Sequence, residues 1–263
     1  MPTAVATRPG SPLTGPARVL VLLDRPLLVA LVTLTLSHCA CVIRATATAA
    51  QSAILLAEWK PHLAILDMDL EGRRVMDQIR VGAGGTRLPV IGLVRRGDLQ
   101  TRLAAFECGA DDIVSVPFAP EELLARVLEV LRRSYGDGVT FQPVIKMGDL
   151  DLDILNRTVR TGTVTLHLTS LEQNLLYLLA ANPGRVITRE EILDTLWGVD
   201  HVAASSVVDR QIRNLRARLQ HDLGRPRYIV TVPGRGYQFL PTFADISQPC
   251  GDAESGAVPD SVN

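Results

Sequence analysis

The residues of this chain best suited to bind a ligand are arginines gathered in one short segment. Between Ser205 and Gly236 only Asp209 and Asp222 are acidic, although the whole chain carries a formal net charge of −1. The arginines of this segment are Arg210, Arg213, Arg216, Arg218, Arg225, Arg227 and Arg235. Guanidinium groups bind phosphates and the edges of bases, so the segment indicates a nucleic-acid partner. The alternative is a helix face whose charges are merely solvated.

The spacing of apolar residues predicts the element that holds these arginines. A helical repeat places Val208, Ile212, Leu215 and Leu219 on one face, which we expect to be buried. The opposite face carries Ser206, Arg210, Arg213, Asn214 and Ala217. Gly224 is expected to end this helix.

A β-hairpin is predicted directly after this helix. Residues 228–232 and 237–240 are largely apolar or aromatic, and they flank the turn sequence Pro233-Gly234-Arg235-Gly236. A basic helix followed by a hairpin with an arginine near its tip is the arrangement of a winged helix on DNA. Because this arrangement accounts for the helix and the hairpin together, we favour it over a solvated helix face.

Two further helix starts and a set of strands precede this unit. Thr169 and Glu172, like Thr188 and Glu191, have the spacing of a capping box, and each pair opens an apolar run. Residues 144–168 alternate apolar and polar side chains, as short antiparallel strands do. The second half of the chain is therefore predicted to run from strands through three helices to a hairpin.

This order of motifs resembles a known family. The sequences LTSLEQNLLYLLAANPGRVITREEILDTLWG, VVDRQIRNLRARL and RYIVTVPGRGYQF are closely similar to the DNA-binding domain of OmpR/PhoB-type response regulators, from about Val144 to Leu240. The helix beginning near Ser206 is then expected in the major groove, with Arg210 and Asn214 on guanine and adenine edges. The residues that match family positions contacting or bordering the phosphate backbone are Trp197, Ser206, Arg213, Arg216, Thr231 and Tyr237.

The predicted hairpin tip departs from the family. Members commonly carry an arginine immediately before the first glycine of the turn, where this chain has Pro233, which lacks a side-chain donor. Arg235 lies between the two glycines instead. We expect Arg235 either to enter a narrow, A·T-rich minor groove or to remain in solvent.

Apolar runs alternate with helical segments in the first half of the chain. The runs are residues 18–23, 41–45, 63–67, 89–94 and 112–116. Helices are expected near residues 25–38, 48–59, 72–82, 98–108 and 119–133. This alternation predicts an α/β fold, a doubly wound, flavodoxin-like domain with five parallel strands and helices on both faces. Functional sites in such domains lie at the carboxyl ends of the strands.

At these strand ends the first half resembles the receiver domain of the same regulators, over about residues 17–133. Asp67 ends the third run, where the family carries its phosphate-accepting aspartate, and residues 109–123 match the family's fifth-strand segment. Phosphoryl transfer in the family also needs a metal held by an acidic pair, a hydroxyl, a lysine and a switching aromatic. At those positions this chain has Leu23 with Asp24, Val94, Val116 and Ile113.

Hydrocarbon side chains at these positions leave a phosphate on Asp67 poorly compensated. We therefore expect no metal and no cofactor, Asp24 as the remnant of an acidic pocket, and DNA binding that does not depend on phosphorylation. Asp67 is then a relic or an inefficient phosphate acceptor. The alternatives are a regulator controlled by phosphorylation of Asp67, a small-molecule sensor with an apolar pocket at Val94 and Val116, and a protein-interaction module.

The resemblance also implies a dimer face on the fourth helix, the fifth strand and the fifth helix. The charged residues at the matching positions are Arg102, Asp111, Asp112, Glu122, Arg126 and Arg133. A face that pairs with its own copy needs both signs of charge, whereas individual exposed ion pairs contribute little stability. We expect a receiver homodimer whose DNA-binding domains lie head to tail on direct repeats.

The predicted organisation has five segments. They are a disordered arm (1–16), a degenerate receiver domain (17–135), a linker (136–143), a winged-helix DNA-binding domain (144–241) and a disordered tail (242–263). The flexibility that direct repeats require is expected from Gly136 and Gly138 in the linker.

Cysteine use and hydropathy indicate a cytoplasmic protein. Cys39, Cys41, Cys108 and Cys250 have neither zinc-site nor disulfide-framework spacing, so reduced thiols are expected. The apolar run from Leu27 to Leu36 is too short to span a bilayer. We expect a transcription regulator rather than an enzyme, with double-stranded DNA, a second copy of the chain and RNA polymerase as partners. Whether a sensor kinase acts on it is left open.

Overall fold

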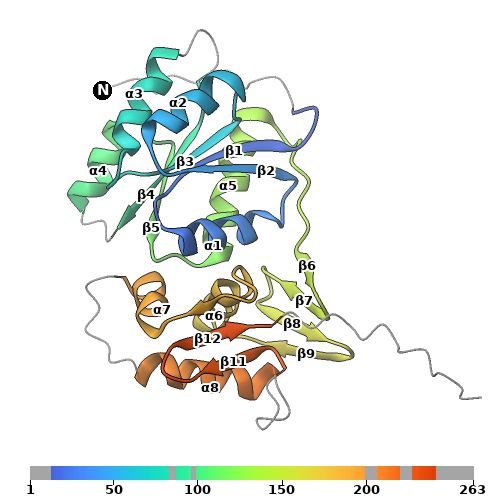
Figure 1. Ribbon diagram of the computed structural model, residues 1–263. Helices are drawn as coiled ribbons and strands as arrows, with labels where there is room; N and C mark the ends of the chain where they lie inside the picture. The colour runs from blue at the N-terminus through green and yellow to red at the C-terminus, as the bar shows by residue number, and fades with distance from the viewer. Residues whose placement is uncertain (1–12, 83–86, 96–98, 199–205, 220–226, 241–263) are drawn as a thin grey trace, which may run out of the picture.

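The computed structural model describes residues 13–82, 87–95, 99–198, 206–219 and 227–240 (Figure 1). The predicted helix stop at Gly224 lies outside these residues, and so does most of the predicted disordered arm and tail. No helix in the described ranges is long and apolar enough to cross a membrane.

The N-terminal half (residues 13–135) is built on a parallel five-stranded sheet with the strand order β2-β1-β3-β4-β5. The strands are β1 Ala17–Leu22, β2 Cys41–Thr46, β3 Leu63–Asp67, β4 Val90–Arg95 and β5 Asp112–Val116. Every residue of β3 is buried because helices cover both of its faces. The predicted runs are confirmed to within one residue at each end.

Helices lie on both faces of this sheet, as the sequence predicts (Figure 1). They are α1 Pro26–Leu36, α2 Ala49–Glu58, α3 Gly72–Gly82, α4 Leu99–Glu107 and α5 Pro120–Tyr135. Two separate cores result, one containing Leu31 of α1 and Val127 of α5, the other Val75 and Ile79 of α3. The predicted doubly wound α/β fold class is confirmed.

The C-terminal half (residues 144–240) begins with a four-stranded antiparallel sheet. Its strands are β6 Val144–Met147, β7 Leu150–Asp153, β8 Thr158–Thr161 and β9 Val164–His167. The remaining elements are α6 Ser170–Ala180, β10 Val186–Ile187, α7 Arg189–Leu196, α8 Ser206–Leu219, β11 Ile229–Val232 and β12 Gly236–Phe239. The predicted order of strands, three helices and a hairpin is confirmed, and the short β10 adds a third strand to the hairpin.

Both predicted capping boxes are present and fix the starts of α6 and α7. Thr169 N donates to Glu172 Oε2 at 2.8 Å, and Glu172 N donates back to Thr169 Oγ1 at 3.3 Å. Thr188 and Glu191 repeat the pattern at 2.9 and 3.1 Å. Each cap satisfies backbone donors that the helix cannot pair and stabilises the start by about 1 kcal/mol.

The two halves share one core where α1 packs against α6. At this contact His38 Nε2 lies 2.7 Å from the hydroxyl oxygen of Tyr177, and His38 Nδ1 lies 2.9 Å from the carbonyl oxygen of Gln142. The His38 and Tyr177 side chains are both buried. The DNA-binding half is thus seated on the N-terminal half by apolar packing and a buried hydrogen bond.

The predicted linker is held against the turn that follows α1. Ala40 N donates to Thr140 O at 2.9 Å, and Gln142 N donates to His38 O at 2.7 Å. Gly136 caps α5 with a φ of 78°, which glycine adopts without strain. The linker that contains Gly136 and Gly138 is thus hydrogen-bonded to the turn after α1, and its flexibility stays a prediction.

Candidate DNA interface and the pocket of Asp67

The helix α8 has the two faces that its sequence predicts. Val208, Ile212, Leu215 and Leu219 are all buried, and they pack into the core of the C-terminal half. The residues of the opposite face that are exposed are Ser206, Arg210, Arg213, Asn214 and Ala217. No described residue forms a hydrogen bond or ion pair with the side chains of Arg210 and Asn214, so both are available to a ligand.

A polar network fixes α8 against the wing, the hairpin of β11 and β12. Asp209 Oδ1 accepts hydrogen bonds from the Tyr237 hydroxyl and from Arg189 Nε, both at 2.6 Å. The Arg189 guanidinium also lies 4.9 Å from the centroid of the Tyr237 ring. The hydrogen bond from Tyr237, aided by Arg189, lowers the pKa of Asp209. The network joins α7, α8 and β12 at one point.

Tyr237 is held in this network from the wing side. Its side chain is buried and its hydroxyl donates to Asp209. That it borders the DNA backbone stays a prediction. Its place in the network makes it a positioning residue, which holds the wing beside α8.

Arg216 also joins α8 to the wing. Its Nε donates to Ile229 O at 3.0 Å, and its Nη2 donates to Thr231 Oγ1 at 2.8 Å. Burial of the guanidinium lowers the pKa of Arg216. An open hollow of about 410 Å³ lies beside it, and the residues that line the hollow are Asp209, Ile212, Arg213, Arg216 and Tyr237.

The remaining predicted DNA-contact residues lie at the end of α7 and on the hairpin of β11 and β12. Trp197 is the C-terminal cap of α7, and its half-buried side chain packs against the core. Thr231 is exposed on β11, and Arg235 is exposed in the turn between β11 and β12. Gly234 has a φ of 69°, so glycine is needed for this turn to present Arg235 at its tip.

Two arginines of the basic segment serve the fold instead. Arg218 Nε donates to Glu172 Oε1 at 2.9 Å, and Arg227 pairs with Asp149. Glu172 is almost fully buried, so Arg218 neutralises a carboxylate that burial would otherwise penalise. Two of the seven arginines of the segment therefore have carboxylate partners within the chain.

Asp67 lies at the carboxyl end of β3, as predicted, and its partner is an arginine. The Asp67 side chain is 3% exposed, and its Oδ2 lies 3.0 Å from Arg95 Nη2. The same nitrogen lies 3.5 Å from Asp24 Oδ1. Arg95 N donates to Asp69 Oδ2 at 2.7 Å, which fixes the arginine at the end of β4. Burial opposes the charge of Arg95, but Asp67, Asp24 and Asp69 together raise its pKa.

Comparison with known proteins places these features in a family. The description "Response regulator receiver domain" matches residues 19–128, and "Transcriptional regulatory protein, C terminal" matches residues 162–239. The DNA-binding response regulator MtrA of Mycolicibacterium smegmatis is 32% identical over 224 residues, which cover 85% of this chain and 97% of the relative. The chain belongs to the OmpR/PhoB-type response regulators.

Two further proteins similar to this response regulator are named as a transcriptional regulatory protein and a response regulator. The KDP operon transcriptional regulatory protein KdpE of Escherichia coli is 35% identical over 181 residues, covering 69% of this chain and 80% of the relative. The crystal structure of the response regulator DrrB of Thermotoga maritima shares 32% identity with a TM-score of 0.39, covering 86% of this chain and 100% of that one. The family description that matches residues 162–239 shows that the C-terminal half is the DNA-binding domain of a transcription regulator.

The four receiver positions that are hydrocarbon in this sequence are buried. Leu23, Val94, Ile113 and Val116 are all buried among core side chains, where the family resemblance implies polar or switching groups. Val94 packs in the core that contains Val75, and Val116 packs in the core that contains Leu31.

The pocket does not fit the divalent metal that the family chemistry needs. Leu23 offers no ligand, and the carboxylates of Asp24 and Asp67 already share the Arg95 guanidinium. Within the described ranges no group of three or more His, Cys, Asp or Glu residues is arranged to hold a metal ion. A divalent cation would have to displace the guanidinium before it could reach both carboxylates.

Arg95 was missed by the sequence reasoning, although a signal for it existed. The resemblance directed attention to the family's lysine position, which is Val116. Arg95 directly follows the hydroxyl position, Val94, at the carboxyl end of the strand that pairs with β3. A cation at that strand end is expected to face Asp67, because the carboxyl ends of parallel strands meet at one edge of the sheet.

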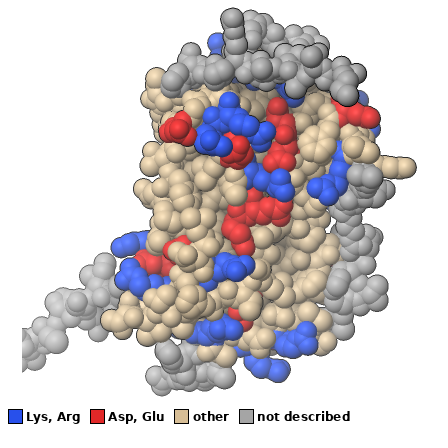
Figure 2. All heavy atoms as spheres, turned by 180° about the vertical axis from the view of Figure 1, so that it is seen from behind, with Lys and Arg blue, Asp and Glu red and all other residues tan. Residues whose placement is uncertain are grey.

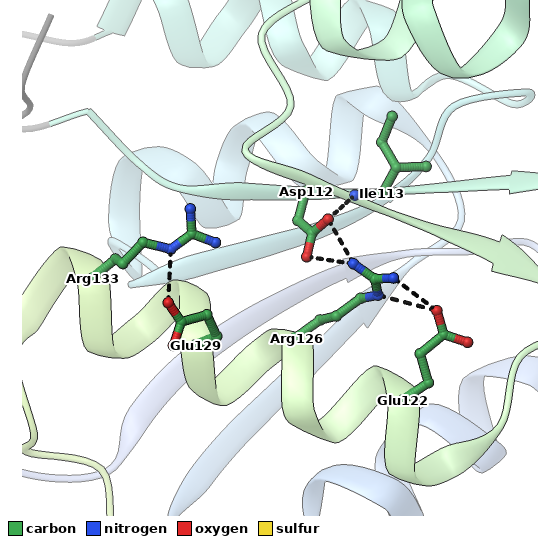
Figure 3. A network of polar contacts seen from close by, with 6 residues as sticks. All are labelled: Asp112, Ile113, Glu122, Arg126, Glu129 and Arg133. Atoms are coloured by element: carbon green, nitrogen blue, oxygen red, sulfur yellow. Dashed lines mark hydrogen bonds and ion pairs between the residues drawn. The ribbon is translucent and has the colours of Figure 1, made fainter. Parts of the chain in front are cut away.

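Four charged residues of the predicted dimer face form ion pairs within one chain (Figure 3), and these are Asp112, Glu122, Arg126 and Arg133. Arg126 Nη1 lies 2.9 Å from Asp112 Oδ1, and Arg126 Nη2 lies 3.0 Å from Glu122 Oε1. Arg133 Nε lies 3.3 Å from Glu129 Oε1. These contacts, first from Asp112 and also from Glu122, raise the pKa of Arg126 although partial burial opposes the rise.

The other two residues of the predicted dimer face lie apart from this network. Asp111 Oδ2 accepts from Val90 N at 2.8 Å, and Asp111 Oδ1 lies 3.4 Å from Arg87. Arg102 is exposed on α4. Seen from behind, acidic and basic side chains lie side by side over the N-terminal half (Figure 2). A surface of this kind carries both signs of charge, as pairing with its own copy requires.

Proposed function

We propose that this response regulator is a sequence-specific DNA-binding transcription regulator that binds its operators without phosphorylation of Asp67. The observation that carries the proposal is the ion pair between Arg95 and Asp67, 3.0 Å long with Asp67 3% exposed. A cation of the chain itself occupies the position in which the phosphorylated family members need a metal and a lysine. A phosphate added to Asp67 would meet no second carboxylate at Leu23 to hold a metal.

The accessibility of α8 also supports this proposal. Its outer face is exposed in the full chain, and the contact between the halves uses α1 and α6 instead. In Figure 1, α8 lies on the side of the C-terminal half away from α1. The DNA-binding surface is therefore not covered by the N-terminal half, so no phosphorylation-driven release is needed to expose it.

The proposed division of roles on DNA follows from exposure and chemistry. Arg210 and Asn214 read base edges in the major groove, because both are exposed on α8 and lack a partner among the described residues. Arg213 and Ser206 contact phosphates, and Arg235 at the wing tip enters the minor groove. Bound at a promoter, the protein would act on RNA polymerase.

The test compares operators bound by untreated and phosphorylated protein. Operators are first selected from random duplex DNA with the unphosphorylated full-length chain, and affinities are measured by fluorescence anisotropy at fixed salt. Asp67→Asn and treatment with acetyl phosphate should each change affinity by less than a few-fold. Asp77→Asn, at an exposed carboxylate on α3, is the matched control. A large gain with acetyl phosphate that Asp67→Asn abolishes and Asp77→Asn preserves would show a phosphorylation-controlled regulator instead.

We further propose a homodimer through α4, β5 and α5. Two large apolar side chains on α4, Leu103 and Phe106, are 50% and 47% exposed. These two side chains add apolar surface to the charged residues of the predicted dimer face. Burial of apolar surface is the main favourable contribution to most protein association.

The dimer test uses an apolar position, because five of the six charged residues already form ion pairs within one chain. Leu103→Asp should dissociate the dimer in sedimentation equilibrium without disturbing the Arg126 ion pairs. Ile54→Asp is the matched control, since Ile54 is 56% exposed on α2, outside the proposed interface. Equal effects of the two substitutions would place the interface elsewhere.

A further inference from the structure

Two cysteines lie in contact at the turn between α1 and β2. The sulfur atoms of Cys39 and Cys41 are 2.7 Å apart. The backbone brings them together, because Cys41 N donates a hydrogen bond to Cys39 O at 2.7 Å and so closes a three-residue turn around Ala40. In an extended strand, residues two apart share a face but are separated by two strand rises. The turn, not the sequence spacing alone, places the thiols in reach of each other.

This arrangement is close to the geometry of a disulfide. A disulfide bond is about 2.05 Å long, so the sulfur atoms need to approach by about 0.7 Å. The burial of the two residues differs, since Cys39 is 5% exposed and Cys41 is only partly buried. A small oxidant can therefore reach Cys41 before it reaches Cys39.

The electrostatics give the two thiols different reactivities. The hydrogen bond between the two sulfur atoms lowers the pKa of Cys41, although burial opposes this. The same hydrogen bond, together with burial, raises the pKa of Cys39. Because the thiolate is the nucleophilic form, Cys41 is the residue of the pair suited to attack an oxidant, and the adjacent Cys39 sulfur lies within reach of the oxidised Cys41.

We propose that Cys39 and Cys41 form a redox site that a hydroperoxide converts to an intrachain disulfide and a dithiol reductant restores. The Cys41 thiolate attacks one peroxide oxygen, the O–O bond breaks, and the departing oxygen takes up a proton, leaving a sulfenic acid on Cys41. Cys39 sulfur then attacks Cys41 sulfur, the S–O bond breaks, and hydroxide leaves with the Cys39 proton as water. Two thiols and one hydrogen peroxide thus give one disulfide and two waters.

The position of this pair connects oxidation to the contact between the two halves. Cys39 directly follows His38, whose ring bonds Tyr177, and its backbone forms a β-bridge with Phe141 of the linker. Ala40, between the cysteines, donates to Thr140 of the linker. Closing the disulfide must rotate both cysteine side chains and adjust this turn. Oxidation should therefore loosen the linker from α1.

The first experiment counts thiols in the full-length chain. A Cys108→Ser, Cys250→Ser chain keeps only the proposed pair and is exposed to graded hydrogen peroxide, followed by a maleimide and intact-mass measurement. The expected product takes up no maleimide, has lost the mass of two hydrogen atoms, and regains both thiols with dithiothreitol. Adding Cys39→Ser should stop oxidation at a Cys41 sulfenic acid, which a dimedone probe detects.

Two outcomes would overturn the redox site. One is that both thiols remain fully reactive to maleimide after a peroxide exposure that oxidises an equal concentration of free glutathione. The other is that the oxidised product is a covalent dimer of two chains, which would mean that the sulfur atoms do not meet within one chain.

The second experiment follows the linker. Limited proteolysis within residues 136–143 should be several-fold faster for the disulfide form than for the reduced form. Peroxide should produce no such change in the Cys39→Ser chain, which cannot close the disulfide. Equal cleavage of the two forms would overturn the connection to the linker. Neither readout involves DNA or phosphate, so a failure here is distinguishable from a failure of the proposed function.

Discussion

The ion pair between Arg95 and Asp67 can be tested by removing its charge without removing its packing. Arg95→Met keeps a long apolar stem at the end of β4 and leaves the Asp67 carboxylate, 3% exposed, without its cation. At an effective dielectric constant of about 20, two charges 3.0 Å apart attract by about 5 kcal/mol. The Arg95 side chain is 36% exposed, so solvent screening reduces this attraction. We expect Arg95→Met to cost about 2 kcal/mol of unfolding free energy.

The assay is urea unfolding of the N-terminal half, followed by fluorescence. The chain has two tryptophans, and a Trp197→Phe background leaves Trp59 on the N-terminal half as the reporter. The substitutions Arg95→Met and Asp67→Asn are measured singly and together, since the double-mutant cycle isolates their interaction. A coupling of about 1–2 kcal/mol is expected, because the cost of Arg95→Met should be small once the buried charge is gone.

A matched ion pair provides the control. Arg74 and Glu71 are 3.1 Å apart, but the Arg74 side chain is 76% exposed. Their cycle should give a coupling below about 0.5 kcal/mol, since exposed pairs contribute little. If Arg95→Met costs the same with Asp67 and with Asn at position 67, the ion pair does not hold the pocket, and the main support for the proposed function is lost.

Three further predictions concern DNA reading, the wing and the contact between the halves. Asn214→Ala should change sequence preference, whereas Arg213→Ala should weaken binding to all sites alike and reduce the slope of log affinity against log salt concentration by about one. Both effects are measured by anisotropy titrations in salt series. Equal losses on operator and random DNA for both variants would remove this division of roles. Tyr237→Phe should cost about 1–2 kcal/mol in unfolding of the C-terminal half, because it removes one of the two hydrogen bonds to Asp209 Oδ1 and leaves only the one from Arg189; an unchanged midpoint would show that the hydroxyl does not hold the wing. Burial lowers the pKa of His38, although Gln142 and Asp153 oppose the shift. The neutral His38 ring therefore contributes stability above about pH 6.5, and this contribution is lost as the pH falls through the lowered pKa of the folded state. His38→Gln should flatten the pH dependence of the melting temperature between pH 7 and pH 5, and an unchanged slope would assign that dependence to other groups.

The elements of this fold were predictable because each has a local signal. Capping boxes at Thr169 and Thr188 mark the starts of α6 and α7, and the apolar spacing on α8 separates its buried face from its basic face. The buried strands of the parallel sheet are continuous apolar runs, which sequence periodicity detects directly. The position of Asp67 followed from the same logic, since it ends such a run.

Contacts between distant residues were not predictable from those signals. Arg218 and Arg227 belong to the basic segment in sequence, but their partners, Glu172 and Asp149, lie on other elements. Periodicity assigns a residue to a face and cannot say which charged side chain it meets there. The Cys39 and Cys41 contact was missed for a related reason, because the backbone turn that joins them has no distinctive sequence.

The contact between α1 and α6 constrains how a dimer can meet DNA. It uses neither the residues proposed to contact DNA nor the proposed dimer face, so both surfaces can act while it persists. If this contact is intact in both copies of a two-fold receiver dimer, the two DNA-binding domains are related by the same two-fold axis. Such a pair of domains fits half-sites in inverted orientation. Binding to direct repeats requires the contact to open in one copy. The strength of the whole contact, its apolar packing together with the buried hydrogen bond between His38 and Tyr177, therefore bears on which of the two operator arrangements the dimer binds.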